Sequence, residues 1–373
     1  MTKEIISTSE KQERAVMVGV GSAALRHGWE LNSSMEELAQ LAKTAGAKVV
    51  GRIVQKLEKP SSTHYIGSGR LQQLVDLKST LNYDTAVFND ELRPRQQRNL
   101  EEALGVKVID RTALILDIFS RSARTKEGKL QVELAQHEYL LPRLAGQWSH
   151  LERLGGGIGT RGPGESQIET DRQLIRKRIS LIKRQIEAVR KHRDLYRRKR
   201  KKSHTPLVAL VGYTNAGKST LLNVLCKSDV LVENKLFSTL DPVTRKLHLP
   251  DGRNILLTDT VGFIHKLPPL IVAAFHATLE ELDEADLLLH VVDITSPDAV
   301  SQSQTVEEIL KQLKLDAKPR ITVVNKIDLL VESLEESGDL TISIKSPPEA
   351  TVVVSAVKTW NLEKLLEKIQ NFL

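Results

Sequence analysis

The sequence lacks the features of secreted and membrane-spanning proteins. Its 373 residues include a single cysteine, Cys226, so the chain cannot form an internal disulfide. No apolar run reaches the roughly 20 residues that a membrane-spanning helix needs, and the first residues show no basic-then-apolar signal pattern. We therefore expect a cytoplasmic protein without a membrane span.

Aromatic residues are also scarce, at 4% of the chain. The most basic segment, which ends at residues 197–202, contains one aromatic, Tyr196, so nothing there indicates base stacking or sequence readout. Basic residues are in excess, with 54 Lys and Arg against 47 Asp and Glu, a formal net charge of +7. This excess suggests a polyanionic partner.

What the sequence does contain is a complete phosphate-binding loop. Residues 212–219 read G-Y-T-N-A-G-K-S, after the apolar run 207–211 and before a helical pattern at 220–227. In such a loop the glycines let backbone N–H groups surround phosphate oxygens, Lys218 reaches the β- and γ-phosphates, and the Ser219 hydroxyl ligates Mg²⁺. The predicted nucleotide-binding residues of this loop are Gly212, Tyr213, Thr214, Asn215, Ala216, Gly217, Lys218, Ser219 and Thr220.

A metal and switch site is predicted further along the chain. Asp259 and Gly262 form a D-x-x-G motif after a strand, where the carboxylate can serve Mg²⁺ and the Gly262 N–H can meet the γ-phosphate. In the loop 237–244, Thr239 is the candidate that closes on Mg²⁺ in the triphosphate state, with Thr244 as the alternative. The predicted metal ligands are Ser219, Thr239 and Asp259, and the predicted catalytic residues are Lys218, Thr239 and Gly262.

The choice of base is predicted from an N-K-x-D motif at residues 325–328. The Asp328 carboxylate can accept hydrogen bonds from both N1–H and the 2-amino group of guanine, whereas adenine would leave this acceptor unpaired. A backbone N–H at Ser355-Ala356 can meet guanine O6. The predicted base-binding residues are Asn325, Lys326, Asp328, Ser355 and Ala356.

One residue typical of signalling GTPases is missing. The position after D-x-x-G that would hold a water-orienting glutamine is Phe263. A phenyl ring cannot orient water, so we expect slow intrinsic hydrolysis unless another group assists. Asn215 is a candidate ligand for K⁺, which could neutralise charge in the transition state; a plain loop hydrogen bond is an equally open interpretation.

Before the phosphate loop, strand and helix patterns alternate from about residue 13 to 120, which is typical of a small, mostly parallel α/β unit. The predicted strands are 15–20, 48–57, 85–88 and 106–109, and the predicted helices are 34–45, 69–81, 94–104 and 113–121. The stretch Gly19–Ala24 mimics a dinucleotide fingerprint, but the second strand lacks a ribose-binding carboxylate, so we reject that interpretation. Gly67–Arg70 is interpreted as the start of a helix rather than a phosphate contact.

Two stretches with apolar residues in steps of four and three predict an antiparallel helical hairpin. Pro142 should kink its first helix, and His137 should lie in its core. The predicted seam is Leu130, Leu134, His137, Leu141, Leu144, Trp148 and Leu151 on the first helix, and Ile175, Ile179, Ile182, Ile186 and Val189 on the second.

The hairpin carries two features that suit a large polyanionic partner. Its connector, residues 155–165, is rich in glycine and can order on binding. Its second helix ends in the basic run 197–202, which fits contact with a nucleic-acid backbone as well as it fits a solvated linker. The predicted RNA contacts are Arg153, Gly156, Gly157, Arg161, Arg197, Arg198, Lys199 and Arg200.

The quoted motifs resemble those of the HflX family of ribosome-associated GTPases, above all the stretch GGGIGTRGPGESQIETDR at residues 155–172. The resemblance covers essentially the whole chain. It implies GTP-dependent binding to the 50S subunit, through 23S rRNA and ribosomal proteins, and splitting or rescue of stalled ribosomes, with the hairpin reaching the peptidyl-transferase region. Several members of that family carry a further C-terminal domain, whereas this sequence stops at Leu373.

We therefore predict an α/β protein with three parts: a small α/β domain at 1–124, a helical hairpin at 125–204 and a P-loop GTPase domain at 205–373. It should hydrolyse GTP to GDP with Mg²⁺, and we expect a monomer. Two other classes stay open. A GTP-regulated switch for a protein partner would not need the basic helix, and an RNA-remodelling enzyme driven by nucleotide would need a second nucleotide site.

Overall fold

The computed structural model describes residues 12–22, 31–144, 163–202, 205–228, 236–237, 239–274, 281–332 and 350–373, without the side chains of 22, 163–168, 192, 194–202, 273 and 274. Its residues group into two compact units, Met1–Ile115 and Leu116–Leu373. The second unit contains both the helical hairpin and the phosphate loop. The division into three domains stays a prediction.

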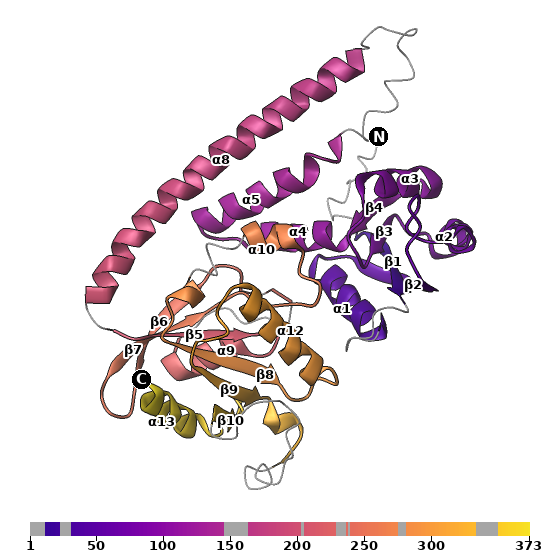
Figure 1. Cartoon of the computed structure of the whole chain (residues 1–373). Helices are drawn as coiled ribbons and strands as arrows, with labels where there is room; N and C mark the ends of the chain where they lie inside the picture. Colours follow the sequence, from indigo (N-terminus) through magenta and orange to yellow (C-terminus); the bar gives the residue numbers. More distant parts are fainter. Residues whose placement is uncertain are drawn as a thin grey trace, which may run out of the picture. The chain divides into compact units, whose positions relative to one another are not determined.

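The first unit is a parallel sheet with helices (Figure 1). Its strands lie in the order β2-β1-β3-β4 and every pair is parallel. This confirms the predicted α/β fold. The elements are β1 (Arg14–Ser22), α1 (Leu31–Thr44), β2 (Lys48–Leu57), α2 (Ser68–Leu81), β3 (Thr85–Phe88), α3 (Pro94–Leu104), β4 (Lys107–Asp110) and α4 (Arg111–Ser122), which continues into the second unit.

The glycines of the rejected dinucleotide fingerprint have a packing role. A side chain at Gly19 would collide with Met35, and one at Gly21 would meet Leu31 at 2.8 Å, so both glycines let α1 approach β1. Gly67 precedes α2 directly, in agreement with its interpretation as the start of a helix.

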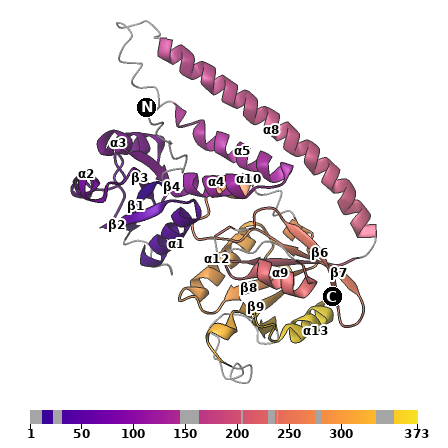
Figure 2. The same ribbon diagram turned by 180° about the vertical axis from the view of Figure 1, so that it is seen from behind.

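The hairpin of the second unit consists of α5 (Lys126–Leu140) and the 40-residue helix α8 (Pro163–Lys202), which lie side by side in both views (Figures 1 and 2). Glu127 near the start of α5 pairs with Arg193, whereas Glu138 near its end pairs with Lys183, which comes earlier in α8. The two helices are therefore antiparallel. The predicted seam of α8 is confirmed, because Ile179 and Ile182 are its most buried apolar residues.

The expectations for α5 were partly wrong. The helix ends at Leu140, before Pro142, rather than continuing with a kink. His137 is half-buried beside Glu133, with Nε2 3.6 Å from a carboxylate oxygen, and does not lie in a core. The buried face is also shifted from the predicted one, to Gly128, Leu130, Gln131, Val132, Ala135 and Tyr139.

The rest of the second unit is a six-stranded sheet in the order β10-β9-β8-β5-β7-β6, with β6 antiparallel to β7 and the other pairs parallel. β5 is buried along its whole length because strands flank it and helices cover it. The elements are β5 (Leu207–Gly212), α9 (Lys218–Cys226), β6 (Val243–His248), β7 (Asn254–Asp259), α10 (Pro269–Ala274), β8 (Leu287–Asp293), α12 (Ala299–Gln312), β9 (Arg320–Asn325), the short 3-10 turn η1 (Ile327–Leu329), β10 (Thr351–Val353) and α13 (Leu362–Phe372).

This topology brings the predicted motifs to one edge of the sheet. The phosphate loop leaves the end of β5, the D-x-x-G aspartate ends β7 and the N-K-x-D asparagine ends β9. Since these strands are parallel, their carboxyl ends meet at the same edge, where ligands of open α/β sheets bind. No helix among the described residues has the length and apolarity to cross a membrane.

Candidate nucleotide site

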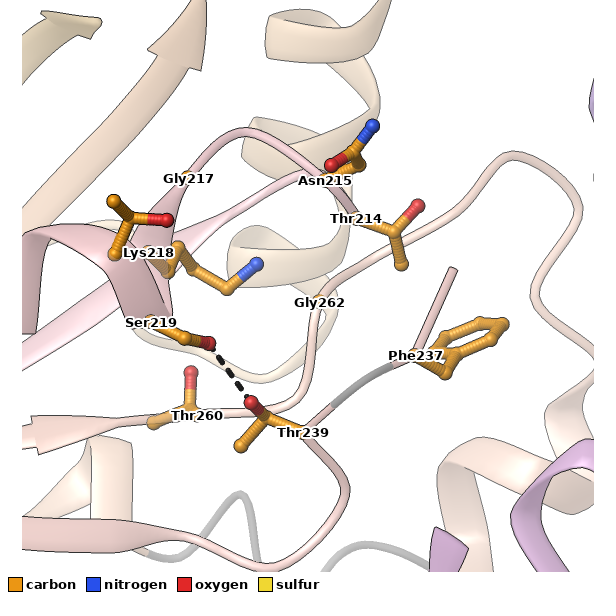
Figure 3. Close-up of a pocket in the computed structure, with 10 residues that line it drawn as sticks. Thr214, Asn215, Gly217, Lys218, Ser219, Phe237, Thr239, Thr260 and Gly262 are labelled. Carbon is orange, nitrogen blue, oxygen red and sulfur yellow. Dashed lines mark hydrogen bonds between the residues drawn. The ribbon is translucent and has the colours of Figure 1, made fainter. Parts of the chain in front are cut away.

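The phosphate loop runs from Gly212 to α9 and is held close to its neighbours (Figure 3). Gly212 has φ +152° and Gly217 φ +94°, both unfavourable for other residues. A side chain at Gly212 would collide with the backbone oxygen of Val291, and one at Gly217 with the amide of Asn325. Glycine is therefore required at both positions by conformation and by space.

Lys218 lies buried at the start of α9. Its ammonium donates hydrogen bonds to the backbone oxygens of Tyr213, at 2.9 Å, and Gly212, at 3.3 Å. Burial lowers the pKa of Lys218 to about 8, while the nearby charge of Asp259 acts in the opposite direction. Lys218 is thus a buried cation whose ammonium is bonded to carbonyls of the phosphate loop, an arrangement suited to a phosphate.

Three predicted metal ligands converge beside this lysine. The Ser219 hydroxyl donates to Asp259 Oδ2 at 2.6 Å and lies 2.8 Å from the Thr239 hydroxyl, which comes from the facing loop (Figure 3). The other predicted candidate, Thr244, lies in β6 and hydrogen-bonds to Thr258 at 2.8 Å. The geometry therefore favours Thr239 over Thr244.

Asp259 itself is fully buried, and its Oδ1 has no hydrogen-bond partner in the described part of the chain. Burial raises the pKa of this carboxyl, whereas Lys218 and the hydroxyls of Ser219 and Thr239 lower it. A buried carboxylate with an unpaired oxygen next to two hydroxyls is a set of hard oxygen donors. These residues fit Mg²⁺.

The loop after β7 is tied to the phosphate loop by its backbone. Thr214 N donates to Phe263 O at 2.8 Å, and Phe263 N donates to Gly212 O at 3.1 Å. A side chain at Gly262 would lie 2.9 Å from the Lys218 ammonium. Phe263 itself is 2% exposed, so its ring is part of the core and is not directed into solvent.

The base-binding motif is linked to the phosphate loop through Asn325. Its side-chain amide donates to Ala216 O at 3.0 Å, and its Oδ1 accepts from Ala356 N at 3.1 Å. Ser355 donates to Asp328 Oδ1 at 2.6 Å. The two predicted base-binding segments, 325–328 and 355–356, therefore lie together, as the sequence suggested.

Family comparison agrees with this geometry. Three family models match consecutive parts of the chain: "GTP-binding GTPase N-terminal" at residues 32–120, "GTP-binding GTPase Middle Region" at 122–200 and "50S ribosome-binding GTPase" at 207–326. The GTPase HflX of Caldanaerobacter subterraneus is 51% identical over 359 residues, which are 96% of this chain and 80% of that protein. The chain belongs to the HflX family of GTPases.

Other HflX proteins agree over similar lengths. The GTPase HflX of Lacrimispora saccharolytica is 45% identical across 99% of this chain and 88% of its own. That of Escherichia coli is 44% identical across 79% and 70%. A solved GTP-binding protein from Sulfolobus solfataricus in complex with GDP is 27% identical over 97% of this chain and 98% of that one, with a TM-score of 0.46. As an HflX-family member, the protein is a GTPase.

Sequence reasoning missed three residues of the site. Phe237 and Thr260 line the same pocket as the phosphate loop, and Thr260 donates to Leu210 O at 2.6 Å. Asp293, at the end of β8, accepts a 2.7 Å hydrogen bond from Lys326 and so fixes the N-K-x-D lysine. Its position at the end of a buried strand was the signal that could have identified it.

The predicted RNA contacts are not tested by the structure. Arg153, Gly156, Gly157 and Arg161 lie outside the described residues. Arg197, Arg198, Lys199 and Arg200 lie in the last turns of α8, and only their backbone is described.

Proposed function

We propose that this HflX-family GTPase binds the large ribosomal subunit and splits or rescues stalled ribosomes in a manner that depends on the bound guanine nucleotide. The observation that carries the proposal is the meeting of Thr239 with Ser219 and Asp259 beside the buried Lys218. In the triphosphate state the γ-phosphate and the metal would add contacts that hold Thr239 in this position, so the loop can report the nucleotide.

In the proposed site the phosphate loop and Thr220 enclose the phosphates, and Lys218 exchanges its loop carbonyls for the β- and γ-phosphate oxygens. Ser219, Thr239 and Asp259 would hold Mg²⁺, which screens the phosphate charge when bound. The Gly262 N–H would approach the γ-phosphate. The Phe263 ring cannot orient a water molecule, so hydrolysis by the free protein is slow. The ribosome supplies or orders the group that positions the attacking water.

For the base, Asp328 pairs with N1–H and the 2-amino group of guanine while Ser355 holds the carboxylate in place at 2.6 Å. Asn325 holds the two base-binding segments together by accepting a hydrogen bond from Ala356 N. A backbone N–H at Ser355-Ala356 would donate to guanine O6. Adenine offers no donor at these two positions, and a missing hydrogen bond costs about 1–3 kcal/mol at an acceptor that the bound base would shield from water. Guanine selection therefore follows from one carboxylate.

Asn215 lies on the rim of the loop and lines the pocket (Figure 3). We propose it as a ligand of K⁺, whose charge would neutralise charge that develops on the phosphates in the transition state. The test is single-turnover hydrolysis in K⁺ against Na⁺, with Asn215→Ala as the variant. Equal rates in the two salts would remove K⁺ from the account.

The ribosome contact is assigned to the hairpin. Its second helix, α8, extends for 40 residues and ends in the basic run 197–202. Phosphate contacts by such a run give affinity without sequence selection and weaken as salt rises. We retain the three-part division at 1–124, 125–204 and 205–373, a monomeric state and a cytoplasmic location as parts of this proposal.

The experiment compares the wild-type chain with a variant in which residues 197–202 are neutral, both loaded with a non-hydrolysable GTP analogue and sedimented with purified 50S subunits. We expect the variant to lose about ten-fold or more in affinity for 50S and to keep its affinity for the analogue. Unchanged 50S binding would instead support a switch for a protein partner. Competition of ATP for the labelled GTP site would support the RNA-remodelling alternative.

A further inference from the structure

Thr239 sits between two residues that attach its loop to neighbouring helices. The second residue after it, Asp241, reaches the start of α5. Asp241 Oδ2 accepts hydrogen bonds from Arg124 N at 2.7 Å and Thr125 N at 2.8 Å, and Oδ1 accepts from the Thr125 hydroxyl. We call this set of contacts the α5 anchor.

Thr125 is also the N-terminal cap of α5, because its hydroxyl accepts from Gly128 N at 2.9 Å. The start of a helix has N–H groups without partners inside the helix and carries partial positive charge. A carboxylate placed there gains both hydrogen bonds and a favourable field. The α5 anchor is therefore an energetically significant contact although it lies near the surface.

Gly128 shows how closely the loop approaches the helix. It is buried in the first turn of α5, and a side chain at this position would collide with Asp241 Oδ1. Glycine inside a helix costs about 1 kcal/mol relative to alanine. The approach of Asp241 explains why the chain keeps glycine where alanine would stabilise the helix.

A second contact holds the other side of Thr239. Phe237 is 2% exposed, and its ring packs edge-to-face on Phe119 of α4 with 4.7 Å between centroids and 84° between planes. Phe237 has φ +59°, a conformation that a bulky residue adopts only where its surroundings require it. The loop is thus attached on one side of Thr239 to α4 and on the other side to α5, the first helix of the hairpin.

The loop after D-x-x-G reaches the same helix. It leads into α10, which begins at Pro269 and packs against α5 in both views (Figures 1 and 2). The loop 237–244 contacts α5 through Asp241, and the loop after D-x-x-G continues into α10, which packs on α5. A movement of α5 would therefore displace both loops that surround the γ-phosphate position.

We propose that Asp241 is a positioning residue for GTP hydrolysis: through the α5 anchor it holds Thr239 at the metal and makes the position of the hairpin and the binding of triphosphate depend on each other. The inference rests on the proposed role of Thr239 as a metal ligand. Because coupling between two sites is reciprocal, a ribosome that binds the anchored position of α5 strengthens triphosphate binding, and triphosphate strengthens ribosome binding by the same factor.

The test measures affinities of the full chain for a fluorescent non-hydrolysable GTP analogue and for GDP, and the Mg²⁺ dependence of single-turnover hydrolysis. For Asp241→Ala we expect about a tenfold loss of affinity for the analogue, which equals about 1.4 kcal/mol, less than a twofold loss for GDP, and a higher Mg²⁺ requirement. Asp241→Asn keeps one acceptor and should lose less. The matched control is Asp251→Ala, which removes a carboxylate bonded to nearby Arg253 in the β6–β7 turn.

Gly128→Ala separates positioning from folding. This change raises the helix propensity of α5, so a purely structural role predicts unchanged or tighter binding. The anchor predicts the opposite, a loss for the analogue similar to that of Asp241→Ala, and little further loss when the two changes are combined. Thermal unfolding of each variant is recorded alongside.

Thr239→Ala makes the outcomes distinguishable. If it weakens the analogue but Asp241→Ala and Gly128→Ala do not, or if they weaken analogue and GDP equally, the inference is overturned while the role of Thr239 stands. If Thr239→Ala has no effect on the analogue, the metal role of Thr239 fails and the inference fails with it. Selective loss in all three variants supports both.

Discussion

The Ser219 hydroxyl donates a 2.6 Å hydrogen bond to the carboxylate of Asp259, which lies 40 residues further along the chain. The contact joins the start of α9 to the end of β7 and leaves the second oxygen of Asp259 buried without a partner in the described part of the chain. Two segments that are distant in sequence thus present their oxygens to one point, next to the Lys218 ammonium.

This relationship predicts the behaviour of Ser219→Ala. Loss of the hydroxyl removes one metal donor and the group that orients Asp259, so the Mg²⁺ concentration for half-maximal hydrolysis should rise about 10- to 100-fold. Hydrolysis is measured against Mg²⁺ at saturating GTP. Ser228→Ala, which removes a hydroxyl bonded to Asn223 just after α9, is the control and should leave the requirement unchanged. An unaltered Mg²⁺ requirement in Ser219→Ala would contradict the metal assignment.

The lowered pKa of Lys218 predicts a pH dependence of nucleotide binding. Burial brings this pKa to about 8 in the empty site, and bound phosphates would raise it again. Above pH 8 the empty protein must therefore take up a proton to bind, and affinity for GDP should fall about eightfold between pH 7.5 and 9. Calorimetry in two buffers of different ionisation enthalpy measures the proton uptake. Binding at pH 9 without proton uptake would show that Lys218 is already charged.

His290 predicts a pH dependence of stability. Burial, and then the charges of Arg320 and Lys218, lower its pKa from 6.5 to about 4. Between pH 6.5 and 4 the unfolded chain binds more protons at this residue than the folded chain, so the free energy of unfolding falls as pH falls, by at most about 3 kcal/mol. Above pH 6.5 the contribution is constant.

The measurement compares urea unfolding of the wild type and His290→Leu at pH 7 and pH 5. Carboxylates that do not contact residue 290 affect both proteins alike, so the difference between them isolates His290 together with its ion-pair partner Glu307. The variant should lose less stability on going to pH 5. Parallel losses in the two proteins would mean that His290 is protonated in the folded state as readily as in the unfolded one.

The motifs that the sequence singled out lie together at one edge of the sheet, because the chemistry of each motif is local. A loop of eight residues carries its own glycines, lysine and serine, and parallel strands bring such loops to one edge of the sheet. The choice of Thr239 over Thr244 as the metal ligand stays a prediction; the structure places Thr239 beside Ser219 and Thr244 in β6, an antiparallel strand that was interpreted as part of the loop.

Sequence reasoning failed where one segment contacts several others. The apolar period of α8 was predicted correctly because this helix packs along one partner, α5. α5 itself packs on both α8 and α10, and its start is bonded to Asp241. Its buried face is therefore wider than one seam and includes Gly128. Contacts such as Asp241 with Thr125 join residues more than 100 positions apart, and no local pattern encodes them.

The most direct test of the account is co-sedimentation of the wild-type protein with purified 50S subunits, comparing a non-hydrolysable GTP analogue with GDP at one fixed salt and Mg²⁺ concentration. The account predicts that the protein is recovered with the subunits in the triphosphate state and largely remains in solution with GDP. Equal recovery in the two states would contradict it.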